Sequence, residues 1–188
     1  MLKIIFNKEL LDLHIEEISK SITKLISKKL KSKLCLYEKE CLVYVKDNLK
    51  SILQADNNQM KKYIEHFKNH FPKAIGDFNT EEKKRKRLYK ILRKDIFEKE
   101  YNNWSFRTKY GAYTFVKKID LKTCPYCNRN YTFIVDKTGN LRPELDHFYP
   151  KSIYPFLAMS FYNLIPSCPI CNHTKSSKVS ENLINPYD

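Results

Sequence analysis

The chain has 188 residues, of which 42% are hydrophobic and 30% are charged, a composition that fits one globular domain or one domain with a small appendage. No apolar run approaches the ~18 residues of a membrane span, and charge within the first residues argues against a secretory signal, so we expect a cytoplasmic protein without a membrane partner. The net charge of +14 favours nucleic acid over an acidic metabolite as the partner, although an anionic membrane surface or simple solubility would also explain the charge by itself.

The first hundred residues have the periodicity of helices. Apolar residues recur at spacings of three and four in four stretches, which cover residues 11–34, 41–52, 60–67 and 88–96. Pro72 is expected to stop the third helix. Asn79 and Glu82 have the spacing of a capping box, which predicts that the fourth helix begins at Asn79. The apolar stripes are predicted to form the core.

The positive charge is concentrated in this first region. Residues 1–110 hold 26 Lys and Arg against 15 Asp and Glu, whereas residues 111–188 hold 9 against 6. The densest run of cations is Lys83, Lys84, Arg85, Lys86 and Arg87. Such a run is commonly a solvated surface, but it can also follow the phosphates of nucleic acid. We therefore predict a basic helical region that binds nucleic acid or a regulatory protein partner.

A second region is predicted to begin near residue 111. Residues 131–135 and 141–145 have the pattern of two strands in a hairpin, with the intervening residues as its turn. Residues 163–166 predict another short strand, and residues 172–180 predict a terminal helix. The expected fold class is therefore α+β.

Four of the six cysteines form two Cys-x-x-Cys pairs. They are Cys124, Cys127, Cys168 and Cys171. Four thiolates suit a closed tetrahedral zinc site, and a reducing cytoplasm disfavours disulfides. The alternative is a redox centre, because Cys-Pro-Tyr-Cys is also a glutaredoxin-like sequence, but the βαβ context of that fold is absent around Cys124. We predict one structural zinc ion that staples residues 111–188.

The residues between and after the pairs carry a second pattern. Asp146 and His147 stand together, Asn163 follows, and Asn172 comes directly after the last cysteine. This pattern resembles the HNH, or His-Me finger, endonucleases that carry paired cysteines, over about 55 residues. The resemblance implies a ββα-metal module with the first histidine at the end of a strand, the asparagine in the next loop or strand, and the third residue on a helix. His147, Asn163 and Asn172 match these three positions.

The resemblance implies metal-dependent hydrolysis of phosphodiester bonds, with DNA favoured over RNA. An imidazole with a pKa near ~6.5 can take a proton from water at neutral pH, which is the general-base role expected for His147. Asp146 and the amide oxygen of Asn172 are expected to hold Mg²⁺ or Mn²⁺, because hard cations prefer oxygen ligands.

The remaining site residues take their expected roles from the same resemblance. Asn163 would orient the His147 ring, and Lys175 or Lys178 would hold phosphate oxygens. His173 directly follows the third position. It would assist the metal, face phosphate or be a solvated helix residue, and the last two interpretations are favoured.

Two other interpretations stay open. A non-catalytic zinc-ribbon module could bind nucleic acid or a protein, but such a module does not need the pair Asp146 and His147. A nuclease that acts as a bacterial defence effector, with its N-terminal helices docked on a regulator, is compatible with the first interpretation. Related nucleases often continue beyond the point that corresponds to Asp188, so a further C-terminal portion is an expectation.

Overall fold

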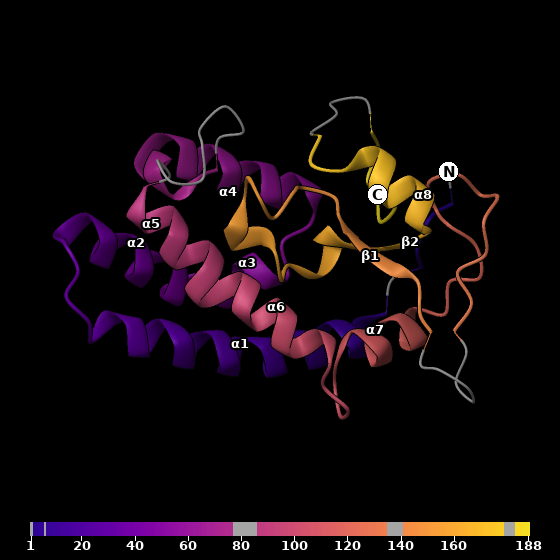
Figure 1. Ribbon diagram of the computed structural model, residues 1–188, viewed down its shortest axis with the longest axis horizontal. Helices are drawn as coiled ribbons and strands as arrows, with labels where there is room; N and C mark the ends of the chain where they lie inside the picture. The colour runs from indigo at the N-terminus through magenta and orange to yellow at the C-terminus, as the bar shows by residue number, and fades with distance from the viewer. Residues whose placement is uncertain (1, 6, 77–85, 135–140, 179–182) are drawn as a thin grey trace.

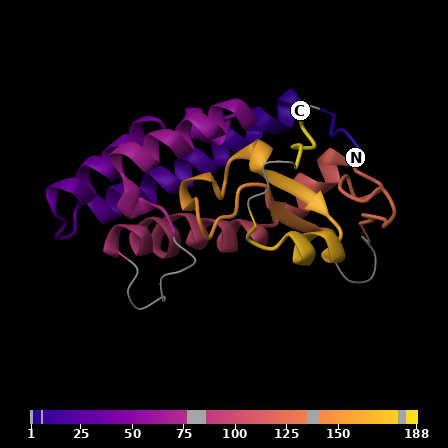
Figure 2. The same ribbon diagram turned by 90° about the horizontal axis from the view of Figure 1, so that it is seen from above.

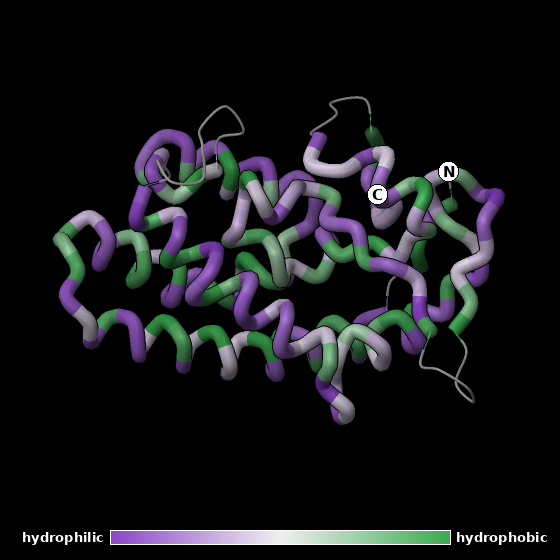
Figure 3. Tube along the Cα trace, in the orientation of Figure 1, coloured by the Kyte–Doolittle hydropathy of each residue, from purple (hydrophilic) through white to green (hydrophobic). Residues whose placement is uncertain are grey.

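The structure is a computed structural model that describes residues 2–5, 7–76, 86–134, 141–178 and 183–188. Helix α1 (Lys8–Leu30) is a long element that runs along one side of the molecule (Figure 1). The Asn7 side chain caps this helix by accepting a hydrogen bond from the Leu10 backbone N–H at 2.9 Å. Figure 3 shows hydrophobic and hydrophilic bands alternating along α1, as expected for a helix with one buried face.

Three further helices follow in the N-terminal region. They are α2 (Leu36–Asp47), α3 (Leu49–Leu53) and α4 (Asn57–His70). Helices α2 and α3 both contact α1. Asp56 and Gln59 form a capping box at the start of α4. Helix α4 ends before Pro72, as the sequence predicts, and the short 3-10 turn η1 (Pro72–Ala74) follows it.

The next helical segment is a rod made of α5 (Arg87–Lys90), η3 (Ile91–Phe97) and α6 (Glu98–Ser105). Its central part, η3, is a π-helix, a wide helical turn that is rare and often lies at functional sites. The π-helix contacts both α1 and the 3-10 turn η4 (Pro155–Leu157). Figure 2 shows the rod (pink) and the first helices (indigo to purple) on either side of the orange segment that contains η4. The helix start predicted at Asn79 lies outside the described residues.

The small sheet consists of two antiparallel strands, β1 (Glu144–His147) and β2 (Leu164–Ser167). Glu144 lies opposite Ser167, and His147 lies opposite Leu164. Strand β2 confirms the strand predicted for residues 163–166 to within one residue. The 3-10 turn η5 (Phe161–Asn163) leads directly into it.

The hairpin predicted over residues 131–145 lies partly outside the described residues, and the described ends of its two strands contact other segments. Tyr131 forms an isolated bridge with Thr123, whereas β1 pairs with β2. The loop of the first cysteine pair is closed by a hydrogen bond from the Cys124 backbone N–H to the Asn130 carbonyl at 2.8 Å. The alternating residues that follow pair back onto this loop. The turn predicted for the hairpin lies outside the described residues.

Two helices border the sheet region, α7 (Ala112–Ile119) and α8 (Pro169–Lys175). Helix α8 begins three residues before its predicted start, because Cys168 acts as its N-cap and Pro169 occupies the first helical position, where a missing N–H is tolerated. It ends before Ser176, which has a positive φ of 48°. The predicted extension of this helix toward residue 180 is therefore wrong for the residues described after Lys175.

The hydrophobic core is continuous across residue 110. Ile18 and Ile22 of α1, Trp104 of α6 and Phe161 of η5 all belong to one buried cluster. The helices and the small sheet agree with the expected α+β class. Within the described ranges, no helix has the length and apolar character needed to cross a bilayer.

His14 is a buried polar residue that joins the two regions. Its Nε2 lies 2.7 Å from the Met159 carbonyl, which can only accept, so Nε2 donates and Nδ1 accepts from the Tyr110 hydroxyl at 2.7 Å. Burial lowers the pKa of His14 to about 4. The ring is therefore neutral in the folded protein at pH values where it is already protonated in the unfolded chain.

We predict that this difference makes the protein sensitive to acid. Between the ordinary histidine pKa of 6.5 and about 4, the unfolded chain binds more protons at His14, so stability falls as pH falls. At about 1.4 kcal/mol per pH unit, the total loss is about 3 kcal/mol. Urea unfolding of the parent and of His14→Gln at pH 7 and pH 4.5 measures this. The variant should lose less stability on acidification, and an equal loss in both proteins would contradict the assignment.

Candidate active site and metal centre

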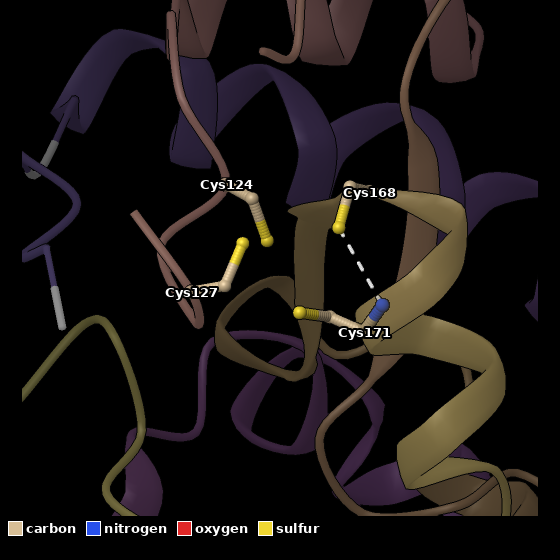
Figure 4. A group of neighbouring side chains, drawn as sticks. All are labelled: Cys124, Cys127, Cys168 and Cys171. Atoms are coloured by element: carbon tan, nitrogen blue, oxygen red, sulfur yellow. Dashed lines mark hydrogen bonds between the residues drawn. The ribbon is translucent and has the colours of Figure 1, made fainter. Parts of the chain in front are cut away.

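The four paired cysteines form one cluster (Figure 4). The first pair lies in the loop after α7, and the second lies at the start of α8. Their four Sγ atoms all lie within 4.8 Å of one another. Zn–S bonds of about 2.3 Å in a tetrahedron place sulfur atoms roughly 3.8 Å apart. The cluster could therefore hold a zinc ion with only small adjustments.

Donor groups favour the thiolate form of two of the four cysteines, Cys127 and Cys168. The Asn130 side-chain amide donates to Cys168 Sγ at 3.2 Å, and the Cys171 backbone N–H donates to the same sulfur at 3.4 Å. The backbone N–H groups of Asn130 and Arg129 lower the pKa of Cys127 to about 6, whereas burial raises the pKa of Cys124 and Cys171 before any metal binds. Thiolates are the form in which cysteine binds metal, so this surrounding fits the predicted structural zinc.

A second group of polar residues surrounds a cavity of about 420 Å³ between β1, α8 and the rod. The cavity is lined by Arg93, Leu145, Asp146, His147, Pro150, Lys151, Ser152, Asn172, His173, Ser176 and Ser177. Three of the four predicted catalytic residues, Asp146, His147 and Asn172, thus share one cavity. The fourth, Asn163, is fully buried and is not among the residues that line the cavity.

His147 ends strand β1 and is 7% exposed. Its Nε2 lies 3.0 Å from the Ala158 carbonyl oxygen. Since a carbonyl can only accept, Nε2 carries the proton, and Nδ1 is the basic nitrogen of the neutral ring. Burial holds the pKa of His147 well below its usual value, with further lowering by Lys151 and Lys175. The ring is therefore neutral near pH 7, the form that can accept a proton.

Asn163 makes three hydrogen bonds to backbone atoms. Its Oδ1 accepts from the Tyr149 N–H at 2.6 Å, and its Nδ2 donates to the carbonyls of Tyr149 at 3.1 Å and Leu157 at 2.8 Å. These bonds fix the loop between β1 and η5, which also carries the Ala158 carbonyl. Asn163 therefore contacts the backbone of the loop that carries the Ala158 carbonyl bonded by His147.

Asp146 is paired with Lys175 inside the protein. Lys175 Nζ lies 3.1 Å from both carboxylate oxygens and donates to the His147 carbonyl at 2.7 Å. The Tyr126 hydroxyl donates to Asp146 Oδ2 at 2.6 Å. The side chains of Asp146 and Lys175 are only 3% and 10% exposed. Lys175, which the sequence assigned to a phosphate, is instead the internal partner of Asp146.

Burial opposes this ion pair. It raises the pKa of Asp146, while Lys175 and Tyr126 lower it, and burial also lowers the pKa of Lys175. We predict that Lys175→Met lowers the free energy of unfolding by about 3 kcal/mol, because it leaves a buried carboxylate without its cation. Adding Asp146→Asn should restore part of this loss. Denaturant unfolding of the two single variants and the double variant measures the coupling, and additive losses would contradict it.

Asn172, the third residue of the predicted pattern, and its neighbour His173 both contact Glu144 of strand β1. Asn172 Nδ2 donates to Glu144 Oε2 at 2.6 Å, and His173 Nε2 lies 3.4 Å from Glu144 Oε1. His173 is 74% exposed, which agrees with a solvated position at the wall of the cavity. Glu144 was not assigned any role from the sequence. Its position two residues before Asp146 on a strand, and thus on the same face, was the available signal.

The lysines and arginines that were predicted to contact nucleic acid have different surroundings in the structure. Lys83, Lys84 and Arg85 lie outside the described residues. Lys86 and Lys178 are exposed. The Arg87 guanidinium bonds the Lys33 carbonyl at 2.6 Å and lies 3.3 Å from Glu38, so it is partly engaged by the protein itself.

Two cations on the cavity wall were not assigned from the sequence. Arg93 comes from the π-helix, and Lys151 follows β1. Lys151 Nζ lies 4.1 Å from the centre of the Tyr101 ring. Lys151 lies in the stretch from Asp146 to Ser152. Nothing in the sequence indicated that Lys151 and Arg93 would line the same cavity, because the two residues come from separate elements.

Comparison with known proteins finds a local similarity. A stretch of 45 residues is 47% identical to the Septu protein PtuB of Bacillus thuringiensis. This stretch makes up 23% of the chain and 18% of that protein, so less than a fifth of the relative's length is matched. The chain matches no family model and no solved structure.

Proposed function

We propose that the chain is a metal-dependent endonuclease that hydrolyses phosphodiester bonds of nucleic acid, with DNA preferred over RNA. The observation that carries this proposal is the position of Asp146, His147 and Asn172 around one cavity, with Nδ1 of a neutral His147 as the available base. A zinc-ribbon module that only binds nucleic acid has no need of such an arrangement.

His147 is the proposed general base. Its bond to the Ala158 carbonyl fixes both the tautomer and the direction of the ring. Asn163 supports this arrangement by holding the backbone of the loop that contains Ala158. A water molecule beside Nδ1 would lose its proton to this nitrogen as it attacks phosphorus.

Asp146 and Asn172 are the proposed ligands of a catalytic cation. The donor set is made of oxygens, because the Asn172 nitrogen is bonded to Glu144 and leaves the amide oxygen available. Oxygen donors fit Mg²⁺ or Mn²⁺. When bound, such a cation supplies positive charge to the phosphate and the leaving oxygen. Lys175 already bonds Asp146, so a cation must share this carboxylate with an ammonium or displace it.

Phosphate would be attracted by the cations of the cavity wall. Arg93 and Lys151 both line the cavity, where Arg93 also lies 3.4 Å from Glu98, and the chain as a whole has a net charge of +14. Lys178 and Lys86, both exposed, are the described members of the predicted nucleic-acid surface. We assign Lys175 to the support of Asp146 rather than to phosphate.

A role in bacterial defence is the proposed context. The local similarity to PtuB is compatible with it. The proposed regulatory protein partner would dock on the N-terminal helices, where Leu36 and Val43 of α2 are exposed apolar side chains. The partner proposal can be tested independently of the nuclease proposal, because a pulldown with the full chain measures partner binding and does not require cleavage.

The nuclease proposal is tested with the full chain and a supercoiled plasmid. Nicked or linear DNA should form in the presence of Mg²⁺ or Mn²⁺, and EDTA should stop the reaction. A structured RNA incubated in parallel measures the preference for DNA. Binding of plasmid without any cleavage, under all of these metal conditions, would favour the zinc-ribbon alternative.

A further inference from the structure

We propose that Glu144 is a positioning residue that fixes the side-chain amide of Asn172, so that its oxygen and not its nitrogen is presented to the cation. This inference rests on the proposed function, in which Asn172 is a cation ligand. It assigns a task to a carboxylate that neither binds the cation nor touches the nucleic acid.

The contact between the two residues selects one orientation of the amide. An ionised carboxylate only accepts hydrogen bonds, so Glu144 Oε2 at 2.6 Å can bond the amide nitrogen of Asn172 but not its oxygen. Hydrogen bonds to a charged acceptor are about twice as strong as neutral ones. Turning the amide over would place its oxygen against the carboxylate. Glu144 therefore holds the Asn172 side chain with the amide oxygen of Asn172 directed away from Glu144.

Two parallel contacts join β1 to α8. Glu144 and Asp146 are two residues apart on the strand and share one face, while Asn172 and Lys175 are three residues apart on the helix and share one face. Glu144 bonds Asn172, and Asp146 bonds Lys175. The first contact commits a nitrogen and leaves an oxygen available. The second contact places Lys175 on the carboxylate, which the cation would have to share, whereas the amide oxygen of Asn172 is not used by the first contact.

His173 provides a natural control. Its Nε2 lies 3.4 Å from Glu144 Oε1, so it touches the other carboxylate oxygen. The His173 side chain is 74% exposed, and its removal leaves the bond between Glu144 and Asn172 in place. A role of Glu144 through Asn172 therefore predicts that His173 has little influence on cation affinity.

The test is a titration of Mn²⁺ into the zinc-loaded full chain without nucleic acid, followed by electron paramagnetic resonance. Glu144→Ala should weaken Mn²⁺ binding roughly 10-fold, the size typical for loss of a residue that orients a metal ligand. Glu144→Gln should keep most of the affinity, because its side-chain oxygen can still accept from the Asn172 amide. His173→Ala should bind Mn²⁺ like the parent. Unchanged zinc content confirms that each variant is folded around the cysteine cluster.

Three results would overturn the proposal. Parent-like affinity in Glu144→Ala would show that the carboxylate does not orient a ligand. An equal loss in Glu144→Gln and Glu144→Ala would show that the negative charge matters rather than the amide orientation. A loss in His173→Ala as large as that in Glu144→Ala would mean that Glu144 acts through His173.

Asn172→Ala separates this inference from the proposed function. If Asn172→Ala loses Mn²⁺ affinity while Glu144→Ala does not, the cation ligand stands and only the role of Glu144 is wrong. If Asn172→Ala binds Mn²⁺ like the parent, the assignment of the ligand itself is wrong, and the proposed cation site falls with it.

Discussion

Replacing His147 with alanine is expected to lower the rate of phosphodiester cleavage by a factor of about 100 or more. The substitution removes Nδ1, the one ring nitrogen that the bond from Nε2 to the Ala158 carbonyl leaves unprotonated. Zinc content and DNA affinity should stay close to those of the parent, because the cysteine cluster and the exposed cations are untouched. Plasmid cleavage under single-turnover conditions, together with a binding assay in EDTA, separates the two effects.

His173→Ala is the matched control for this experiment. His173 is one residue beyond the predicted third position, but its side chain is mostly exposed and contacts Glu144 rather than His147. Its removal should leave cleavage within a few-fold of the parent rate. The general-base assignment fails if His147→Ala cleaves as fast as the parent, or if His173→Ala alone abolishes cleavage.

Loss of one cysteine from the cluster should have the largest effect on structure. Helix α8 has seven residues, and none of them is buried. Helices shorter than about 12 residues are marginal on their own, so α8 depends on its attachments. Cys168 and Cys171 would tie it through zinc to the first cysteine loop, and zinc binding contributes roughly 10 kcal/mol or more in small zinc domains. Cys168→Ser is therefore expected to release zinc and disorder α8.

Elemental analysis and hydrogen exchange measure this outcome. The parent should contain about one zinc per chain, and Cys168→Ser should show rapid exchange of the backbone amides of α8 and little cleavage activity. Cys35→Ser is the control, because Cys35 is exposed and lies outside the cluster. A freshly reduced parent without zinc, or one with a disulfide between Cys124 and Cys127, would contradict the structural-zinc prediction.

The parts of the protein that could be predicted from sequence are those with short-range signals. Helix α1 has an uninterrupted apolar stripe, and α4 has a capping box and a stopping proline. The cysteine cluster follows from two Cys-x-x-Cys pairs, because thiolates at this spacing have few other uses in a reducing compartment. Strand β2 agrees with the short strand predicted for residues 163–166 to within one residue.

The contacts inside the candidate site could not be predicted, because they join residues that are distant in sequence. Glu144 meets Asn172 across 28 positions, and Lys175 meets Asp146 across 29. Lysine near the end of a helix is usually solvated, so only the packing of α8 on β1 reveals Lys175 as the partner of Asp146, with a side chain that is 10% exposed. The pairing of β1 with β2 could not be predicted for a related reason, since alternation of apolar residues indicates a strand but not which segment it pairs with.

The order of residues in α8 has a consequence for how the protein tolerates changes in length. Cys171 is a proposed zinc ligand, Asn172 is the next residue, and Lys175 follows one turn later. An extra residue inserted between Cys171 and Lys175 would rotate the rest of the helix by about 100° and remove Lys175 from Asp146. The segment from Cys168 to Lys175 therefore allows substitutions at its exposed positions but no insertion or deletion, since one helical register serves both the metal cluster and the cavity.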